Sequence, residues 1–139
     1  MKNPIASQAI LIATPLFTLL LTILYLTDQV SFSFLADEIG SQAPIINQWS
    51  KVTFLIGSTT MICLLFKRYL AVRYMLSGLF ISIVVLQLPP TVLWLIFLML
   101  SIPIQLDIEL IITAVYHGII IILGLISLKI NVSYIQNRS

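Results

Sequence analysis

Charged residues are scarce in this sequence: lysine, arginine, aspartate and glutamate make up 9% of its 139 residues, whereas 60% are hydrophobic. A soluble domain needs charged residues for about a quarter of its composition to cover its surface. The scarcity therefore excludes an ordinary soluble domain and predicts an outer surface that meets lipid or apolar protein. The formal net charge of +2 is too small to indicate nucleic-acid binding.

Cysteine and histidine are equally rare, which limits the chemistry that the chain can perform. The single cysteine, Cys63, excludes an internal disulfide and a thiol pair for redox exchange. The single histidine would need another subunit to complete a haem site with two histidine ligands. No nucleophile, base and acid can be assembled, and no G-x-S-x-G, H-E-x-x-H or P-loop pattern occurs. We therefore expect no enzyme, no cofactor and no metal site.

Long hydrophobic runs are what the sequence does contain. They predict an all-α integral membrane protein, a bundle of four transmembrane helices over about residues 5–27, 49–66, 74–100 and 107–128. The third run is longer than one straight span requires, and Pro89 and Pro90 interrupt it, which predicts a long helix with a kink at the prolines. In the alternative, the two prolines form a tight turn and the chain crosses the membrane five times.

The segments between these runs predict the orientation of a single multi-pass domain. Residues 28–48 form an external loop, whose apolar side chains favour a position along the membrane interface, and residues 129–139 form a short cytoplasmic tail. Trp49 and Trp94 are expected at the interfaces. With four spans, all basic residues except Lys51 fall on one side, which becomes the cytoplasmic side. An abundance of isoleucine and leucine favours a bacterial gene, so we expect the cell inner membrane with both termini cytoplasmic.

The last predicted span carries the most polar helix face, on which Thr113, Tyr116 and His117 lie together. His117 follows Asp107 by about 15 Å along a helix axis. This distance places His117 near the middle of the membrane, where an ionisable side chain is a candidate for function. The imidazole is either a neutral hydrogen-bonding group that orients the bundle or a contact for a proton, a quinone or a ligand. Gln87, just before the proline pair, is a further candidate for this intramembrane polar site.

Small and hydroxylated residues recur at helical spacing in the predicted spans. Such residues let membrane helices approach closely and form hydrogen bonds across the contact. A polar pathway for a solute is the alternative interpretation of the same pattern. We expect helix-packing seams at Thr14, Thr18, Thr22, Thr53, Gly57, Thr60, Gly78, Ser82 and Gly124.

These features favour a non-enzymatic accessory, structural or interaction subunit of a membrane complex. Its expected partners are the lipid bilayer and either other membrane subunits or further copies of itself. The first alternative is a small oligomeric transporter or channel, with a polar site around His117 and the break at Pro89 and Pro90. The second alternative is a redox subunit that holds a quinone or shares a haem with another subunit.

Overall fold

The computed structural model describes residues 4–26, 43–101 and 108–138, and the elements within them are α-helices. The all-helical fold class is therefore confirmed. The predicted external loop lies outside the described residues as far as residue 42. The helices are α1 (Pro4–Leu26), α3 (Ala43–Leu65), α4 (Leu70–Ser101) and α5 (Ile108–Arg138).

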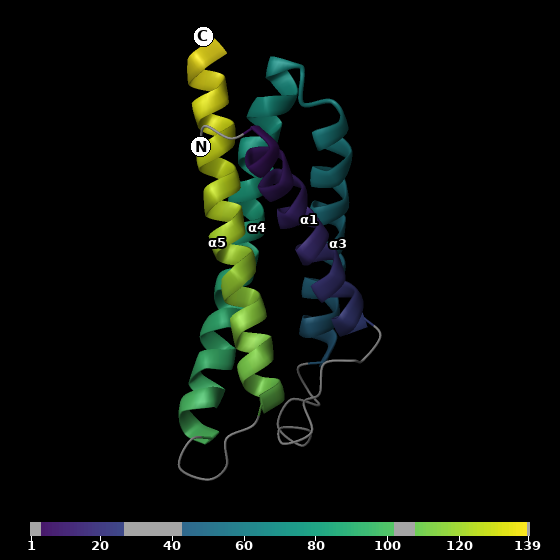
Figure 1. Cartoon of the computed structure of the whole chain (residues 1–139). Helices are drawn as coiled ribbons and strands as arrows, with labels where there is room; N and C mark the ends of the chain where they lie inside the picture. Colours follow the sequence, from purple (N-terminus) through teal and green to yellow (C-terminus); the bar gives the residue numbers. More distant parts are fainter. Residues whose placement is uncertain (1–3, 27–42, 102–107, 139) are drawn as a thin grey trace.

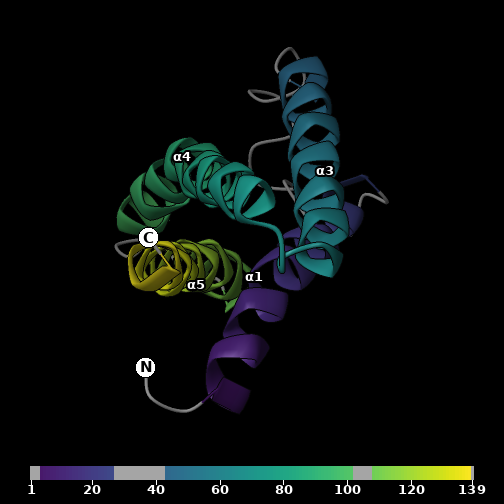
Figure 2. The ribbon, with the colours of Figure 1, turned by 90° about the horizontal axis from the view of Figure 1, so that it is seen from above.

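The helices form a ring in which α1 packs against α3 and α5, and α4 packs against the same two neighbours. A short turn joins α3 to α4, so these two helices run in opposite directions (Figure 1). Seen from above, α1 crosses the bundle obliquely from the side of α5 to the side of α3 (Figure 2). The start of α1, the end of α5 and the turn between α3 and α4 lie at the same end of the bundle (Figure 1), which we call the terminal end.

Prolines lie in the first turn of two of these helices. α1 begins at Pro4, as predicted, because the fixed φ of proline suits a first turn and its missing N–H would have no partner there. α3 begins at Ala43 and includes Pro44, so it starts several residues before the predicted boundary at residue 49. The physical reason is the same, since a proline in the first turn removes no hydrogen bond from the helix.

α4 runs without interruption through Pro89 and Pro90, so the tight turn required by the five-span alternative does not form. Each proline lacks the N–H that would bond the carbonyl four residues earlier, which frees the carbonyls of Val85 and Leu86. The Leu86 carbonyl accepts the indole N–H of Trp49 at 2.8 Å. A side chain of α3 therefore replaces a hydrogen bond that the prolines removed from α4.

α5 continues past Lys129, where the apolar run ends, as far as Arg138. The predicted short tail is thus helical over its described part. Its inward face explains this, because Asn131 and Ile135 are buried and Asn131 is hydrogen-bonded to Arg73 of α4. Tertiary contacts at the terminal end hold these last turns in place.

Three of the described helices contain stretches long and apolar enough to cross a membrane: Pro4–Leu26, Leu70–Ile96 and Ile111–Asn137. In α3, Gln48 and Lys51 make the first turns more polar. The core between the helices is apolar, and large hydrophobic side chains also cover the outside of the bundle. An apolar surface around an apolar core indicates a membrane protein.

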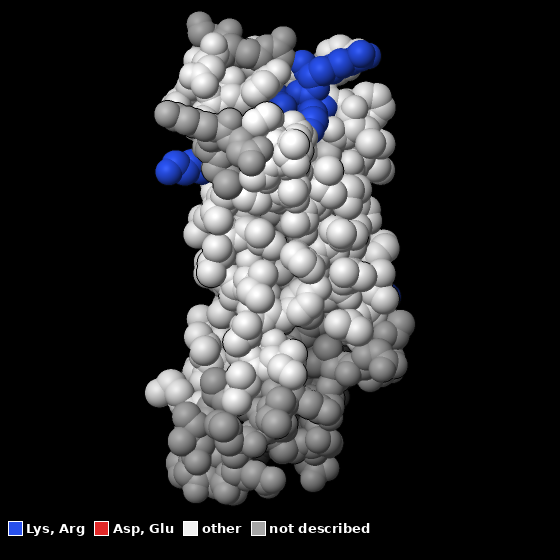
Figure 3. Space-filling view, viewed as in Figure 1, with Lys and Arg blue, Asp and Glu red and all other residues white. Residues whose placement is uncertain are grey.

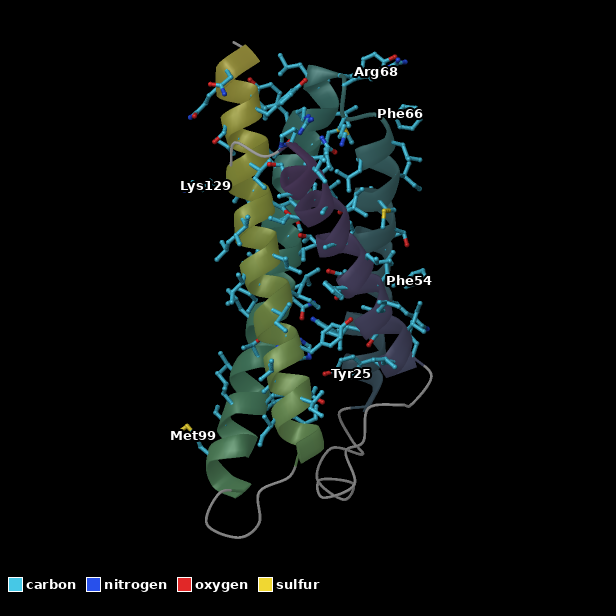
Figure 4. All side chains as sticks on the ribbon, viewed as in Figure 1. Tyr25, Phe54, Phe66, Arg68, Met99 and Lys129 are labelled. Carbon is cyan, nitrogen blue, oxygen red and sulfur yellow. The ribbon has the colours of Figure 1, made fainter. Side chains whose placement is uncertain are left out.

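Basic side chains are concentrated toward the terminal end. In Figure 3 the blue atoms of lysine and arginine gather mainly there, and the described surface between the two ends is largely uncharged. Arg68 and Lys129 lie in this half of the bundle, whereas Lys51 is near the start of α3, toward the opposite end (Figure 4).

Candidate functional site

The first polar cluster of the interior is centred on His117 of α5, which is fully buried. The hydroxyl oxygen of Tyr25 (α1) lies 2.8 Å from Nε2 of the imidazole, and the amide oxygen Oε1 of Gln87 (α4) lies 2.5 Å from Nδ1. A neutral imidazole with its proton on Nδ1 satisfies both contacts, because Nδ1–H donates to Gln87 while Nε2 accepts the tyrosine proton. Three helices therefore meet at one imidazole.

Trp94 of α4 extends this chain of hydrogen bonds, since its indole N–H donates to the Tyr25 hydroxyl at 2.8 Å. The donors then follow one direction, from Trp94 through Tyr25 and His117 to Gln87. Trp94 is only 2% exposed, so it lies inside the bundle instead of on its surface, where an interfacial tryptophan would meet lipid headgroups. A buried indole needs an acceptor, and Tyr25 supplies it.

Trp49 of α3 brings the remaining helix to the same place. Its ring centroid lies 5.4 Å from that of Tyr25 and 5.9 Å from that of His117, with interplanar angles of 73° and 54°. Such tilted and edge-to-face arrangements are favourable for aromatic rings. Figure 4 shows Tyr25 in the half of the bundle away from the terminal end. We call Tyr25, Trp49, Gln87, Trp94 and His117 the His117 cluster.

Two fully buried side chains carry a polar atom that has no hydrogen-bond partner among the described residues. These atoms are Nε2 of Gln87 and Oγ1 of Thr53. Gln87 belongs to the His117 cluster through its other amide atom, and Thr53 follows Trp49 by one turn of α3. A buried polar group without a partner costs about 1–3 kcal/mol. Both atoms are therefore energetically unfavourable unless a further group forms a hydrogen bond with each of them.

The second polar cluster lies toward the terminal end, around the buried Arg73 of α4. Its Nε donates to the Lys67 carbonyl at 2.7 Å and its Nη1 to Oδ1 of Asn131 at 3.2 Å. Asn131 Nδ2 donates in return to the Arg73 carbonyl at 2.7 Å and to Ser77 Oγ at 2.8 Å. The guanidinium lies 3.8 Å from the ring centroid of Tyr134, a cation–π contact. We call Lys67, Arg73, Ser77, Asn131 and Tyr134 the Arg73 cluster.

Lys67 is the part of the Arg73 cluster that lies in the turn between α3 and α4. Partial burial, and after it the positive charge of Arg73, lower the pKa of the Lys67 ammonium. Both causes disfavour the charged form of the lysine. The cluster is therefore held by hydrogen bonds and a ring contact that accommodate two nearby cations.

The residues expected at packing seams lie mostly inside the bundle. Thr14 Oγ1 lies 2.7 Å from Ser127 Oγ, which joins α1 to α5. A Cβ on Gly124 would lie 2.6 Å from Val84, and one on Gly57 would lie 3.2 Å from Leu19, so both glycines mark close helix contacts. Three further threonines are fully buried and donate to carbonyls of their own helices: Thr18, Thr22 and Thr60.

Gly78 and Ser82 differ from the other seam residues. A Cβ on Gly78 would meet no described atom within 4 Å, and the Ser82 hydroxyl donates to the Gly78 carbonyl of its own helix at 2.8 Å. The described helices therefore leave this face of α4 uncovered at Gly78, and its expected role in packing against another helix stays a prediction.

Two of the polar residues predicted near His117 lie at the edge of its cluster. Tyr116 is half-buried, donates its hydroxyl to the Phe17 carbonyl at 3.0 Å, and packs edge-on against the Phe17 ring at 6.0 Å. It therefore joins α5 to α1 without reaching the imidazole. Thr113, one turn before His117, is also half-buried.

The structure adds residues that the sequence did not single out as site residues. Tyr25 lies on the same face of the first span as Thr14, Thr18 and Thr22, and this position was the available indication that it points inward. Trp49 and Trp94 are of a residue type that is common at membrane interfaces. Residue type therefore gave no indication that their indoles form hydrogen bonds inside the bundle. Arg73 and Asn131 lie at the ends of apolar runs, where polar residues ordinarily meet water.

The arrangement limits what His117 can do chemically. Both of its ring nitrogens already contact protein groups, so neither is free to bind a haem or a metal without the loss of a hydrogen bond. Within residues 4–26, 43–101 and 108–138, no three His, Cys, Asp or Glu side chains come close enough to hold a metal ion. The cluster can hold four helices in register, and its continuous hydrogen bonds can also redistribute a proton.

Comparison with protein-family models, with curated proteins and with solved structures gives no match to this chain. The functional argument therefore rests on the geometry of the two clusters and on the surface around them.

Proposed function

We propose that the chain is a non-enzymatic accessory or interaction subunit of a membrane complex, which crosses a bacterial inner membrane four times. The observation that carries this proposal is the hydrogen bonding of His117. This histidine is bonded on both sides by protein, through Tyr25 and Gln87, and has aromatic rings around it. A polar group in that position holds helices together.

The chemistry around His117 supports a role without catalysis. The groups that it contacts are a phenol and a carboxamide, and neither is a nucleophile that an imidazole ordinarily activates. Thr14 and Ser127 are hydrogen-bonded to each other and lie at a different level of the bundle. The hydroxyls of Thr14 and Ser127 thus serve a helix contact separate from that of the imidazole.

The distribution of charge supports a cytoplasmic position for both termini. Arg68 and Lys129 lie toward the terminal end (Figure 4), and Lys67 lies in the turn between α3 and α4 at that same end (Figure 1). Basic residues are retained on the cytoplasmic side of a membrane. A four-span arrangement also includes α3, whose apolar outer face is exposed at Leu55, Ile62 and other positions.

The apolar outer surface supports a partner within the membrane. Met99 of α4 is 71% exposed and Leu65 of α3 is 78% exposed. Gly78 adds a place where α4 presents its backbone with no described side chain nearby. Lipid and a partner helix both fit such a surface, and a subunit of a complex would use both.

A small oligomeric transporter is the second candidate, because one observation favours it. Gln87 and Thr53 each leave a buried polar atom without a described partner in the interior of the bundle. Polar groups of this kind line solute pathways in membrane proteins. The hydrogen bonds that already occupy His117 place this candidate behind the first.

The subunit proposal is tested by purification of the tagged protein from its own host in a mild detergent. We expect one other membrane protein at fixed stoichiometry, measured by light scattering and mass spectrometry. His117→Gln should retain that assembly, because glutamine also offers a donor and an acceptor. A homo-oligomer that contains no other protein would contradict the proposal and favour the transporter.

Orientation is tested by fusion of alkaline phosphatase or a fluorescent protein after Ser139. We expect fluorescence and no phosphatase activity, because both termini would face the cytoplasm. The matched control places the same reporters within residues 28–42, where phosphatase should be active. Phosphatase activity at Ser139 would contradict the orientation and the four-span count.

A further inference from the structure

The unpartnered atoms Gln87 Nε2 and Thr53 Oγ1 lie on adjacent helices, and both side chains are fully buried. Rotation of the Gln87 amide group by 180° would not give partners to both of its polar atoms. If Oε1 and Nε2 changed places, Nε2 would face His117 and the oxygen would be left without a partner. In either orientation, one polar atom of Gln87 is available for a ligand.

Thr53 differs from the other buried threonines of the bundle. Thr14, Thr18, Thr22 and Thr60 each donate to a carbonyl of their own helix, at distances of 2.7–3.0 Å. This back-bond is the ordinary way in which a threonine within a helix satisfies its hydroxyl. Thr53 makes no such bond, so its buried hydroxyl is left without a partner among the described residues.

The register of α3 against α4 puts the two residues at neighbouring levels of the bundle. The bond from Trp49 to the Leu86 carbonyl puts the start of α3 at the level of Gln87, and Thr53 lies about 6 Å from Trp49 along the helix axis. Side chains lean toward the N-terminus of their own helix. Because α3 and α4 run in opposite directions, Gln87 leans toward the level of Thr53 and Thr53 leans toward the level of Gln87 (Figure 1).

The geometry points to a binding site for one buried water molecule between Gln87 and Thr53. Water fits because it donates and accepts, so it can complete either orientation of the Gln87 amide as well as the Thr53 hydroxyl. Two hydrogen bonds of about 2.8 Å through one water oxygen can bridge polar atoms about 4–5 Å apart. Both side chains are fully buried in the bundle, which favours a ligand as small as water.

This water extends the hydrogen-bond chain of the His117 cluster from Gln87 to α3. Trp94, Tyr25, His117 and Gln87 connect α4, α1 and α5, and the water adds Thr53 as a second polar attachment of α3 besides Trp49. The inference is independent of whether the protein is a subunit or a transporter, because a structural water serves both.

Nuclear magnetic resonance of the ¹⁵N-labelled protein in detergent micelles tests the site. The side-chain amide signal of Gln87 is assigned by its absence from a Gln87→Met sample. We expect a dipolar cross-peak between bound water and this amide in the wild type. Thr53→Val keeps the shape of the side chain and removes the hydroxyl, so the cross-peak should disappear.

Thr60→Val is the matched control, because Thr60 is also buried on α3 but donates to the Ile56 carbonyl. Its cross-peak should equal that of the wild type. The midpoint of thermal unfolding gives a second readout: Thr53→Val should lower it by several degrees, whereas removal of a hydroxyl with no ligand would raise it. The absence of a cross-peak in the wild type, its persistence in Thr53→Val, or a raised midpoint would overturn the proposal.

Discussion

Both polar clusters hold buried polar side chains inside an apolar bundle, but one is neutral and the other contains a charge. The His117 cluster is neutral, lies away from the terminal end, and draws side chains from all four described helices. The Arg73 cluster contains a buried cation, lies toward the terminal end, and joins the turn after α3 to α4 and α5. The first cluster sets how the helices sit relative to one another, and the second secures one end of them.

The difference follows from the distance to water. A charge in the middle of an apolar bundle would require strong desolvation, so the interior uses an imidazole, a phenol, an amide and two indoles. Near the end of the helices, Arg73 can keep its charge because backbone and side-chain oxygens solvate the guanidinium and Tyr134 covers its face. Loss of one partner should therefore have a larger effect in the charged cluster.

Asn131→Leu should have the largest effect, because it removes the side-chain acceptor of Arg73 and the donor to Ser77. Hydrogen bonds to charged groups contribute about 1.5–3 kcal/mol each. We expect the free energy of unfolding, measured by denaturant titration in detergent, to fall by about that amount. Asn137→Leu, at an exposed position near the end of α5, is the control and should change little. Equal effects of the two variants would show that the Arg73 cluster does not support the fold.

Gly124→Ala tests the α4–α5 contact on which both clusters depend. The new methyl group would lie 2.6 Å from Val84 Cγ2, closer than carbon atoms can approach, so a side chain or a helix must shift. Such overpacking costs about 1–3 kcal/mol. Gly78→Ala is the matched control on α4, where the methyl group meets no described atom and alanine is the better helix former. We expect a lower unfolding midpoint for the first variant only, and a normal midpoint in Gly124→Ala would contradict the close contact.

His117→Leu should have a smaller effect than Asn131→Leu, because the bonds that it removes are neutral. Interhelical hydrogen bonds in a membrane bundle contribute about 0.6 kcal/mol on average. The loss of the contacts to Tyr25 and Gln87 should therefore lower stability by roughly 1 kcal/mol. His117→Gln should unfold nearly as the wild type does and keep its function, measured by complementation. A well-folded His117→Gln protein that is inactive would show that the imidazole has a role beyond the scaffold.

Lys67→Gln should have the smallest effect, within about 0.5 kcal/mol, as expected for a partly exposed position. Because the folded-state pKa of Lys67 is lowered, its charged form opposes folding at neutral pH, and the penalty fades as pH rises through that pKa. The variant should thus equal or slightly exceed the wild type in stability at neutral pH, with the difference shrinking in alkaline buffer. A clear loss of stability at neutral pH would mean that the Lys67 charge supports the turn.

The sequence predicted much of the fold because helix content and hydropathy are local properties. Pro4 correctly marked the start of α1, and the third run was correctly expected to be one long helix that includes Pro89 and Pro90. The last span was predicted to end near residue 128 because Lys129 closes the apolar run, and α5 continues beyond this point, where Asn131 is hydrogen-bonded to Arg73. That contact joins residues far apart in the sequence, and hydropathy carries no information about it.

The candidate site was predictable only in part. Helical periodicity put His117 on an inward face, and the chemistry of amides in apolar runs selected Gln87. Nothing in their spacing indicated that these two side chains contact each other or that Tyr25 completes the set. The indoles of Trp49 and Trp94 were assigned to the membrane interface because amphipathic aromatic residues are common there, and their inward hydrogen bonds depend on neighbours from other helices.

The amino-acid sequence by itself determined that this is an apolar, all-helical chain with basic turns and a few polar residues on inward faces. The tertiary structure alone decided which polar groups share hydrogen bonds: Tyr25 with His117, His117 with Gln87, and Arg73 with Asn131. The physical reason is that a helix forms from contacts within a few residues, whereas the partner of a buried polar group depends on the tilt and register of neighbouring helices. In an apolar bundle those two quantities are set by packing, at places such as Gly57 and Gly124, and the polar groups then take the partners that packing brings within reach.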